Sequence, residues 1–92
     1  MPALAEAEAA ARLNSLPGWK IAGGELTRTF TLADFRTALA FVHKVGELAE
    51  QAGHHPDIDI RYNKVRLGLV THDAGGLTGK DFDLAGSVNK LI

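Results

Sequence analysis

Four histidines are the side chains of this 92-residue chain best suited to moving a proton at neutral pH, because an imidazole titrates near pH ~6.5. His54 and His55 are adjacent and stand directly before Pro56, and His72 comes later in the chain. His43 lies inside a predicted helix, off its apolar stripe, and is interpreted as a solvated surface residue. We therefore take the other three histidines as candidates for acid–base chemistry or metal binding.

A β-hairpin is predicted between these histidines. Residues 57–62 and 65–69 alternate polar and apolar side chains, which is the period of half-buried strands. The side chains assigned to the buried face are Ile58, Ile60, Tyr62, Val65, Leu67 and Leu69. Asn63 and Lys64 separate the two strands, and asparagine tolerates the left-handed conformation that a two-residue turn requires.

The register of this hairpin decides where the histidines lie. With that two-residue turn, Tyr62 pairs with Val65. Continuation of the same register sets His55 opposite His72, with Cβ atoms roughly 5 Å apart. His54 then lies one residue back, at the turn from helix to strand. Three histidines are thus expected to meet at the open end of the hairpin.

The amino-terminal part of the chain predicts a helix and a first hairpin. An alanine-rich helix is expected over residues 3–13, within an N-terminal helical segment 1–16. It is interpreted as a short exposed helix, with Leu4, Ala7 and Ala11 on one face. Gly23-Gly24 then favours a tight turn that pairs Ile21 with Leu26, because both glycines tolerate a positive φ.

Two further helices are predicted around the second hairpin. The first spans about residues 32–52, with Thr31 as its N-cap and Gly53 as its C-terminal stop. Its apolar stripe is expected to be Leu32, Phe35, Leu39, Val42, Val45 and Ala49. In the last helix Thr78 is the N-cap and Asp81 completes a capping box. Its apolar side is expected to be Phe82, Ala85, Val88 and Ile92.

The element order α-β-β-α-β-β-α predicts an α+β fold. We expect a two-layer sandwich in which helices pack on one face of a four-stranded antiparallel sheet. The length and the hydrophobic fraction of 46% fit a single domain over residues 1–92. Open sheet edges and the small size favour self-association into a dimer or a larger assembly.

The composition excludes several classes of protein. The chain has no cysteine, which rules out disulfides, thiolate catalysis and cysteine-based metal sites. Ten Lys and Arg against eleven Asp and Glu give a net charge of -1, which offers no attraction to a nucleic-acid backbone. No apolar run approaches the ~18 residues of a membrane span. No targeting segment is recognised, so we expect a cytoplasmic protein.

Two chemistries remain open for the histidine cluster. Three imidazoles with Asp73 or Asp81 could ligate zinc, although adjacent residues such as His54 and His55 point to opposite faces of an extended chain. Alternatively, two imidazoles on different sides of a small molecule can remove one proton while donating another, without a metal. Asp81 has a simpler interpretation as a helix-capping residue, and it could serve both roles.

The same residues resemble the pterin-4a-carbinolamine dehydratase family. The family pattern is an acidic residue, His-His-Pro, an aromatic residue, a histidine and an aspartate at fixed spacings. In this chain the matching residues are Glu50, His54, His55, Pro56, Tyr62, His72 and Asp81. The pattern spans about a third of the chain, and the expected element order covers nearly all of it.

The resemblance implies a hydro-lyase that converts 4a-hydroxytetrahydropterin to quinonoid dihydropterin, in the recycling of tetrahydrobiopterin for aromatic amino-acid hydroxylases. It implies a homodimer or homotetramer with no metal and no cofactor. The implied catalytic residues are His54, His55 and His72. The implied substrate-binding residues are Glu50, Gly53, Pro56, Val70, Thr71, Asp73 and Asp81. The alternatives are a non-catalytic dimerisation or interaction module of the same fold and a histidine-based zinc site.

Overall fold

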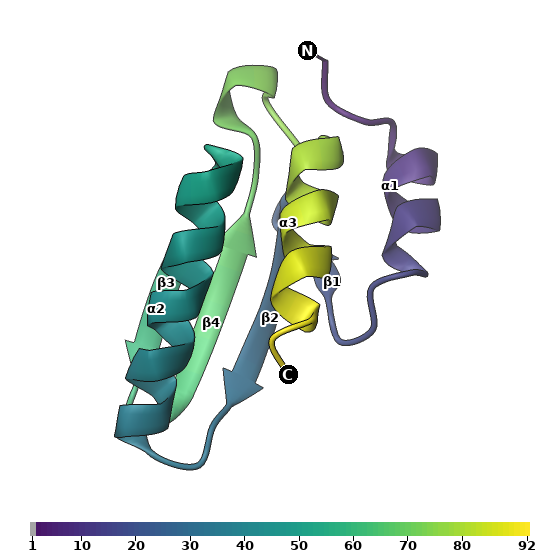
Figure 1. Cartoon of the computed structure of the whole chain (residues 1–92). Coiled ribbons are helices and arrows are strands. Elements are labelled where there is room, and N and C mark those ends of the chain that lie inside the picture. The colour runs from purple at the N-terminus through teal and green to yellow at the C-terminus, as the bar shows by residue number, and fades with distance from the viewer. Residues whose placement is uncertain (1) are drawn as a thin grey trace.

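The computed structural model describes residues 2–92, and its elements follow the expected order (Figure 1). The helices are α1 (Glu6–Leu13), α2 (Phe35–Ala52) and α3 (Gly79–Asn89). The strands are β1 (Lys20–Ala22), β2 (Glu25–Thr31), β3 (Asp57–Arg61) and β4 (Lys64–Leu69), and a one-turn 3-10 helix, η1 (His72–Ala74), precedes α3. All four strands form one antiparallel sheet in the order β1-β2-β4-β3, which confirms the α+β prediction. Within residues 2–92, no helix combines the length and the apolar character needed to cross a membrane.

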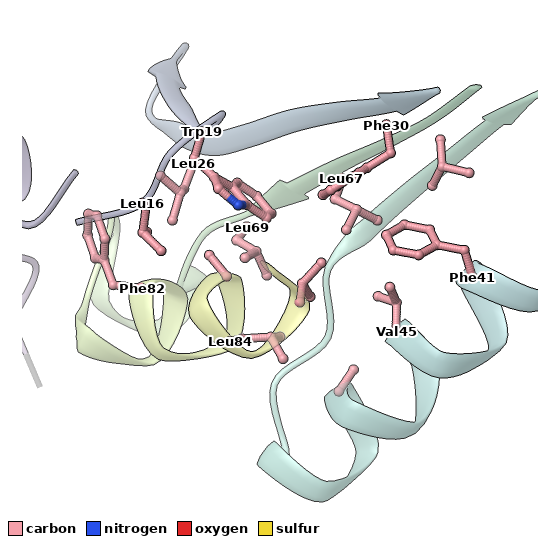
Figure 2. Close-up of a cluster of buried hydrophobic side chains, with 14 of the residues drawn as sticks. Leu16, Trp19, Leu26, Phe30, Phe41, Val45, Leu67, Leu69, Phe82 and Leu84 are labelled. Atoms are coloured by element: carbon pink, nitrogen blue, oxygen red, sulfur yellow. The ribbon is translucent and has the colours of Figure 1, made fainter. Parts of the chain in front are cut away.

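The core lies between the sheet and the pair of helices α2 and α3, which run side by side over one of its faces (Figure 1). Figure 2 shows Phe41 and Val45 of α2 directed toward Phe30 and Leu67 of the sheet. The rings of Phe30 and Phe41 lie 4.7 Å apart between centroids. Alternate residues of the central strand β4 are fully buried because only one face of a strand meets the helices.

Helix α1 starts later than predicted. The chain before it is extended, and Leu4 donates a backbone hydrogen bond to the Leu77 carbonyl, 2.7 Å away, in the loop before α3. Most of the helix is exposed as predicted, and Ala9 is its buried residue. Leu4, predicted to share a helical face with Ala7 and Ala11, lies before the helix and is half-buried. The predicted segment 1–16 begins at Met1, which lies outside the described residues.

Helix α2 also starts three residues later than predicted, with a different cap. Thr31 ends β2 and pairs with Lys64, and the N-cap is Asp34. The buried residues are Ala38, Phe41, Val45 and Ala49. Phe35 and Leu39 are 47% and 45% exposed, so the predicted stripe mixed two neighbouring faces of the helix, only one of which meets the sheet. The predicted stop at Gly53 is confirmed, with a left-handed φ of 63°.

The second hairpin turns one residue earlier than predicted. Arg61 pairs with Lys64, so the turn consists of Tyr62 and Asn63. Tyr62 has a φ of 55° and is 69% exposed. The Asn63 side-chain amide donates to the Leu32 carbonyl at 2.9 Å, and the Asn63 backbone carbonyl accepts the Leu32 N–H at 2.8 Å. These contacts hold Asn63 in the turn beside Leu32. The predicted Asn63-Lys64 turn is therefore wrong, and so is the predicted burial of Tyr62.

The earlier turn changes what lies opposite the histidines. Val65 pairs with Ile60, and continuation of this register sets His55 opposite Val70. The predicted direct pairing of His55 with His72 is therefore wrong. Val65 is fully buried, as predicted for this face of β4, whereas Ile58 on the edge strand β3 is 38% exposed.

Helix α3 is anchored at both ends. The predicted capping box between Thr78 and Asp81 is confirmed at its start. At its other end the Asn89 side-chain oxygen accepts hydrogen bonds from the Trp19 indole at 2.7 Å and from the Arg28 guanidinium at 2.8 Å. The helix ends at Asn89, and the predicted burial of Ile92 is wrong because this residue lies beyond the helix and is 62% exposed.

Replacement of Asp34 should test the helix start. The carboxylate accepts the Thr37 backbone N–H at 2.8 Å, which lowers the pKa of Asp34. We expect Asp34→Ala to lower the melting temperature by roughly a few degrees at pH 7, and Asp34→Asn to lower it less, because asparagine is also a good N-cap.

The pH dependence gives a second measurement of the same cap. The folded-state pKa lies below the unfolded one, so the contribution is present above the ordinary aspartate pKa and is lost as the pH falls through the lowered value. The difference between wild type and Asp34→Ala should therefore shrink in acid. Equal melting temperatures for all three proteins at pH 7 would contradict this cap.

Candidate active site

A small open cleft lies where the end of α2, the loop after β4 and the start of α3 come together, at the upper end of Figure 1. Its volume is about 280 Å³. The lining residues are Gly53, His54, His55, Val70, Thr71, His72, Asp73 and Lys80. All of them except Lys80 were predicted from the sequence as site residues. The fold therefore brings the three histidines together although they are not paired across the hairpin.

Two changes of backbone direction place the histidines. Gly53 ends α2 in the left-handed conformation, and the next residue, His54, still donates its N–H to the Ala49 carbonyl at 3.1 Å. On the other segment, Thr71 forms an isolated bridge with Gly76, which closes the loop that contains η1. The chain thus changes direction after α2 and again after β4, and the two loops that result line the same cleft.

His54 is paired with a buried carboxylate. Its Nε2 lies 2.5 Å from Oδ1 of Asp81. The His54 side chain is 11% exposed and the Asp81 side chain is fully buried. Since an ionised carboxylate only accepts hydrogen bonds, Nε2 is the protonated nitrogen in this pair and Nδ1 is left for other partners. The pairing fixes both the tautomer and the orientation of the His54 ring.

Asp81 is held by three groups at once. Its second oxygen, Oδ2, accepts the Thr71 hydroxyl and the Thr78 backbone N–H, both at 2.9 Å. The Thr78 hydroxyl lies 2.8 Å from that of Thr71 and completes the network. Among residues 2–92, no buried side-chain polar atom lacks a hydrogen-bond partner. Asp81 therefore has the capping role and also orients a site histidine.

His55 and His72 lie at the open side of the cleft. Nε2 of His55 is hydrogen-bonded to Oε2 of Glu50, with the two side chains 64% and 78% exposed. A pair this exposed adds little to stability, so its effect is to orient the His55 ring. His72 begins η1 and is exposed. One enclosed and two accessible imidazoles thus surround the hollow.

The structure separates a few predicted residues from the cleft itself. Glu50 and Pro56 line a neighbouring groove of about 590 Å³ between α2 and β3, which His55 also borders. His43 lies along that groove, paired with Glu47 at 2.7 Å on the surface of α2, and is exposed as predicted. Asp81 lies behind His54 and is not part of the cleft lining.

Lys80 is the lining residue that sequence reasoning missed. It lies between the cap Thr78 and Asp81, where the capping-box pattern treats it as a spacer. The missed signal was its place in the first turn of α3, next to a predicted site residue. Over residues 2–92, no group of three or more histidine, aspartate or glutamate side chains is arranged to hold a metal ion.

Comparison with known proteins relates the whole chain to one family. A family model described as pterin 4 alpha carbinolamine dehydratase matches residues 2–91. A relative from Acidobacterium capsulatum, with the proposed name pterin-4-alpha-carbinolamine dehydratase, is 64% identical over 81 residues, which are 88% of each chain. A relative from Chloroflexus aurantiacus with the same proposed name is 59% identical over 92 residues, covering 100% of this chain and 99% of that one.

Two solved structures share the fold. A transcriptional coactivator/pterin dehydratase from Brucella melitensis has a TM-score of 0.92 and 34% identity, over 97% of both chains. A pterin dehydratase-like protein identified as a RuBisCO assembly factor in the α-carboxysome has a TM-score of 0.68 and 23% identity, over 80% of this chain and 88% of that one. The second likeness shows a common fold alone.

Removal of the buried Asp81 carboxylate should destabilise the folded protein. Asp81→Ala leaves the Thr71 hydroxyl and the Thr78 N–H without their acceptor, and we expect a loss of about 2–4 kcal/mol in the free energy of unfolding, measured with urea. Asp81→Asn keeps a carbonyl oxygen and should cost less. Asp83→Ala, at an exposed position on the same helix, is the control and should change little. Equal losses at positions 81 and 83 would contradict the network.

Proposed function

This chain belongs to the pterin 4 alpha carbinolamine dehydratase family, and from that membership we propose that its histidine cleft removes water from a 4a-hydroxytetrahydropterin. The product is a quinonoid dihydropterin. The observation that carries the proposal is that His54, His55 and His72, from two separate segments, line one hollow. A non-catalytic interaction module of the same fold would have no need of this arrangement.

The reaction requires two proton transfers and no change of oxidation state. The bond between C4a and its hydroxyl oxygen breaks, and that oxygen takes up a proton and leaves as water. The proton on N5 is removed, and the electron pair of the broken N5–H bond forms the new double bond between N5 and C4a. One group must donate a proton while another accepts one, so the number of protons on the enzyme is unchanged after a turnover. Imidazoles suit both tasks because both of their protonation states exist near neutral pH.

The proposed roles follow from burial and pairing. His54 keeps Nδ1 for the substrate because Nε2 is engaged with Asp81, which makes Asp81 a positioning residue. His55 and His72, exposed at the opening, supply the other proton-transfer group and contacts to the ring. Glu50 orients His55 from outside the cleft.

The ring itself would be held by the remaining lining residues. Gly53, Val70, Thr71 and Asp73 surround the hollow between the histidines. A pterin ring is flat and carries hydrogen-bond donors and acceptors on its edge, so backbone and side-chain polar groups on these two loops can bind that edge. Pro56 would act indirectly, by keeping His55 in an extended conformation.

Histidine replacements test the proposal. We expect His55→Ala and His72→Ala each to lower the dehydration rate by roughly 100-fold or more, which is the usual scale of general acid–base catalysis. The change in pterin ultraviolet absorbance measures the rate. His43→Ala removes an exposed histidine outside the cleft and should leave the rate within about twofold.

The same assay tests the metal-free mechanism. Full activity in the presence of a strong chelator is the expected result, and loss of activity that zinc restores would support the zinc alternative instead. Unchanged rates in both His55→Ala and His72→Ala would contradict the assignment of the cleft.

We also propose that the protein is a homo-oligomer that contacts its own copy through strand β3. This strand is an edge of the sheet, and its backbone groups can pair with a second β3 around a two-fold axis. Antiparallel pairing centred on Ile60 would set Asp59 opposite Arg61 on both sides of the axis, which joins opposite charges. Ile58 on this strand borders the groove beside α2 and would be covered by the partner.

Two matched variants test this contact. Ile58 and Ile21 are isoleucines on the two edge strands, with exposures of 38% and 37%. Ile58→Lys should convert the assembly to monomers in light scattering coupled to gel filtration, whereas Ile21→Lys should leave the mass unchanged. A monomeric wild type, or dissociation by Ile21→Lys alone, would contradict the β3 interface.

The proposed reaction also implies neighbours in metabolism. Its substrate forms when an aromatic amino-acid hydroxylase uses a reduced pterin, and its product must be reduced before it can be used again. We therefore propose a functional link to such a hydroxylase, in the cytoplasm.

A further inference from the structure

The extended chain before α1 contacts the loop that carries His72. This segment, residues 2–5, is named the strap here, and it passes beside the start of α3 at the upper end of Figure 1. The Leu4 N–H donates to the Leu77 carbonyl at 2.7 Å. A Cβ added at Gly76 would lie 3.0 Å from the Cβ of Ala3. Two successive residues of the strap thus touch two successive residues of the loop.

His72 differs from the other two cleft histidines in how its ring is held. The rings of His54 and His55 are each paired with a carboxylate. In the described part of the chain, the hydrogen bonds and ion pairs of histidine rings involve His43, His54 and His55, and none reaches the His72 ring. The position of the His72 ring therefore depends on the backbone of its loop.

The two arms of this loop are held by different contacts. The first arm is fixed at Thr71, whose hydroxyl donates to Asp81 at 2.9 Å. The tip contains a short-range backbone hydrogen bond from Ala74 to the Thr71 carbonyl, at 3.0 Å. The second arm returns at Gly76, which exchanges two backbone hydrogen bonds with Thr71, at 3.1 and 3.3 Å. Where the tip lies thus depends on the second arm, which is the arm that the strap touches.

Open space lies on the other side of the second arm. A groove of about 460 Å³ is bordered by Gly75 of the loop and by Ile21 and Gly24 of the β1–β2 hairpin. The strap residues Ala3 and Leu4 border the same groove. Here the loop faces this space rather than packing against the hairpin, and the strap supplies the contact.

We propose that Leu4 is a positioning residue whose hydrogen bond to the second arm keeps His72 at the cleft. The inference rests on the proposed dehydratase function, in which His72 belongs to the group of proton-transfer residues. Leu4 does not line the cleft, so it acts through the loop. The Leu77 side chain is buried and anchors the end of the arm, so loss of the Leu4 contact should shift the loop without unfolding the protein.

Proline at position 4 removes the hydrogen-bond donor. Leu4→Pro lacks the backbone N–H, and we expect kcat to fall about fivefold, the effect of one net hydrogen bond. Ala5→Pro is the matched control because Ala5 has a φ of -65°, which proline adopts. Within residues 2–92, the Ala5 N–H donates no hydrogen bond to another backbone group. The control should therefore keep kcat within about twofold of wild type.

A second variant presses on the same contact from the loop. Gly76→Ala places a methyl group against Ala3, and the φ of Gly76 lies outside the left-handed region, so the backbone accepts alanine. We expect kcat to fall about fivefold as the crowded arm moves. Addition of Ala3→Gly removes the opposing Cβ and should restore kcat to within about twofold of wild type. Failure of this rescue would contradict the contact.

Histidine backgrounds show through which residue the strap acts. In His72→Ala, addition of Leu4→Pro should change the residual rate by less than about twofold, because the group that Leu4 positions is already gone. In His55→Ala, the same addition should still lower the rate about fivefold. An equal fall in both backgrounds would contradict a role through His72 and indicate a general loss of structure.

Hydrogen exchange measures the loop independently of catalysis. The amides of Thr71 and Gly76 should exchange about fivefold faster in Leu4→Pro, whereas the amides of β4 should keep their wild-type rates. Faster exchange in a protein without dehydratase activity would support the hold of the strap on the loop and contradict the proposed function instead. Unchanged exchange together with unchanged kcat in Leu4→Pro and Gly76→Ala would overturn the positioning role.

Discussion

The site depends on one buried carboxylate. Asp81 accepts hydrogen bonds from the Thr78 backbone, the Thr71 hydroxyl and the His54 ring, and it is fully buried. A buried charge is costly unless every oxygen is paired, so the carboxylate requires all three groups to stay in place. These groups belong to the start of α3, to the segment after β4 and to the loop after α2. The same interaction therefore caps a helix and sets the orientation of the His54 ring.

Much of the arrangement was predictable because local signals agreed with tertiary packing. The capping box fixed the start of α3 at Thr78, and Gly53 fixed the end of α2, since each signal acts within a few residues. The β1–β2 turn at Gly23-Gly24 was predicted for the same reason, and Ile21 pairs with Leu26 as expected. The histidines were singled out by their residue type and predicted convergence, and the family resemblance implied the other lining residues except Lys80.

What the sequence did not reveal depends on contacts between distant segments. The turn at Tyr62 and Asn63 is set by hydrogen bonds to Leu32, which no local pattern contains. Sequence reasoning reached a histidine cluster through the wrong register, and the loop at Thr71 brings His72 to the cleft by another route. Lys80 was missed because it lines the cleft only through the position of α3 relative to the loops after α2 and β4. A capping motif does not encode that position.

A crystal structure with a bound dihydropterin tests the central claim most directly, namely that the cleft beside the Asp81–His54 pair holds the ring. The expected result places N5 and C4a of the ring within hydrogen-bonding reach of imidazole nitrogens of the histidine cluster. A pterin bound in the groove between α2 and β3, beside His43, with the cleft unoccupied, would contradict the claim.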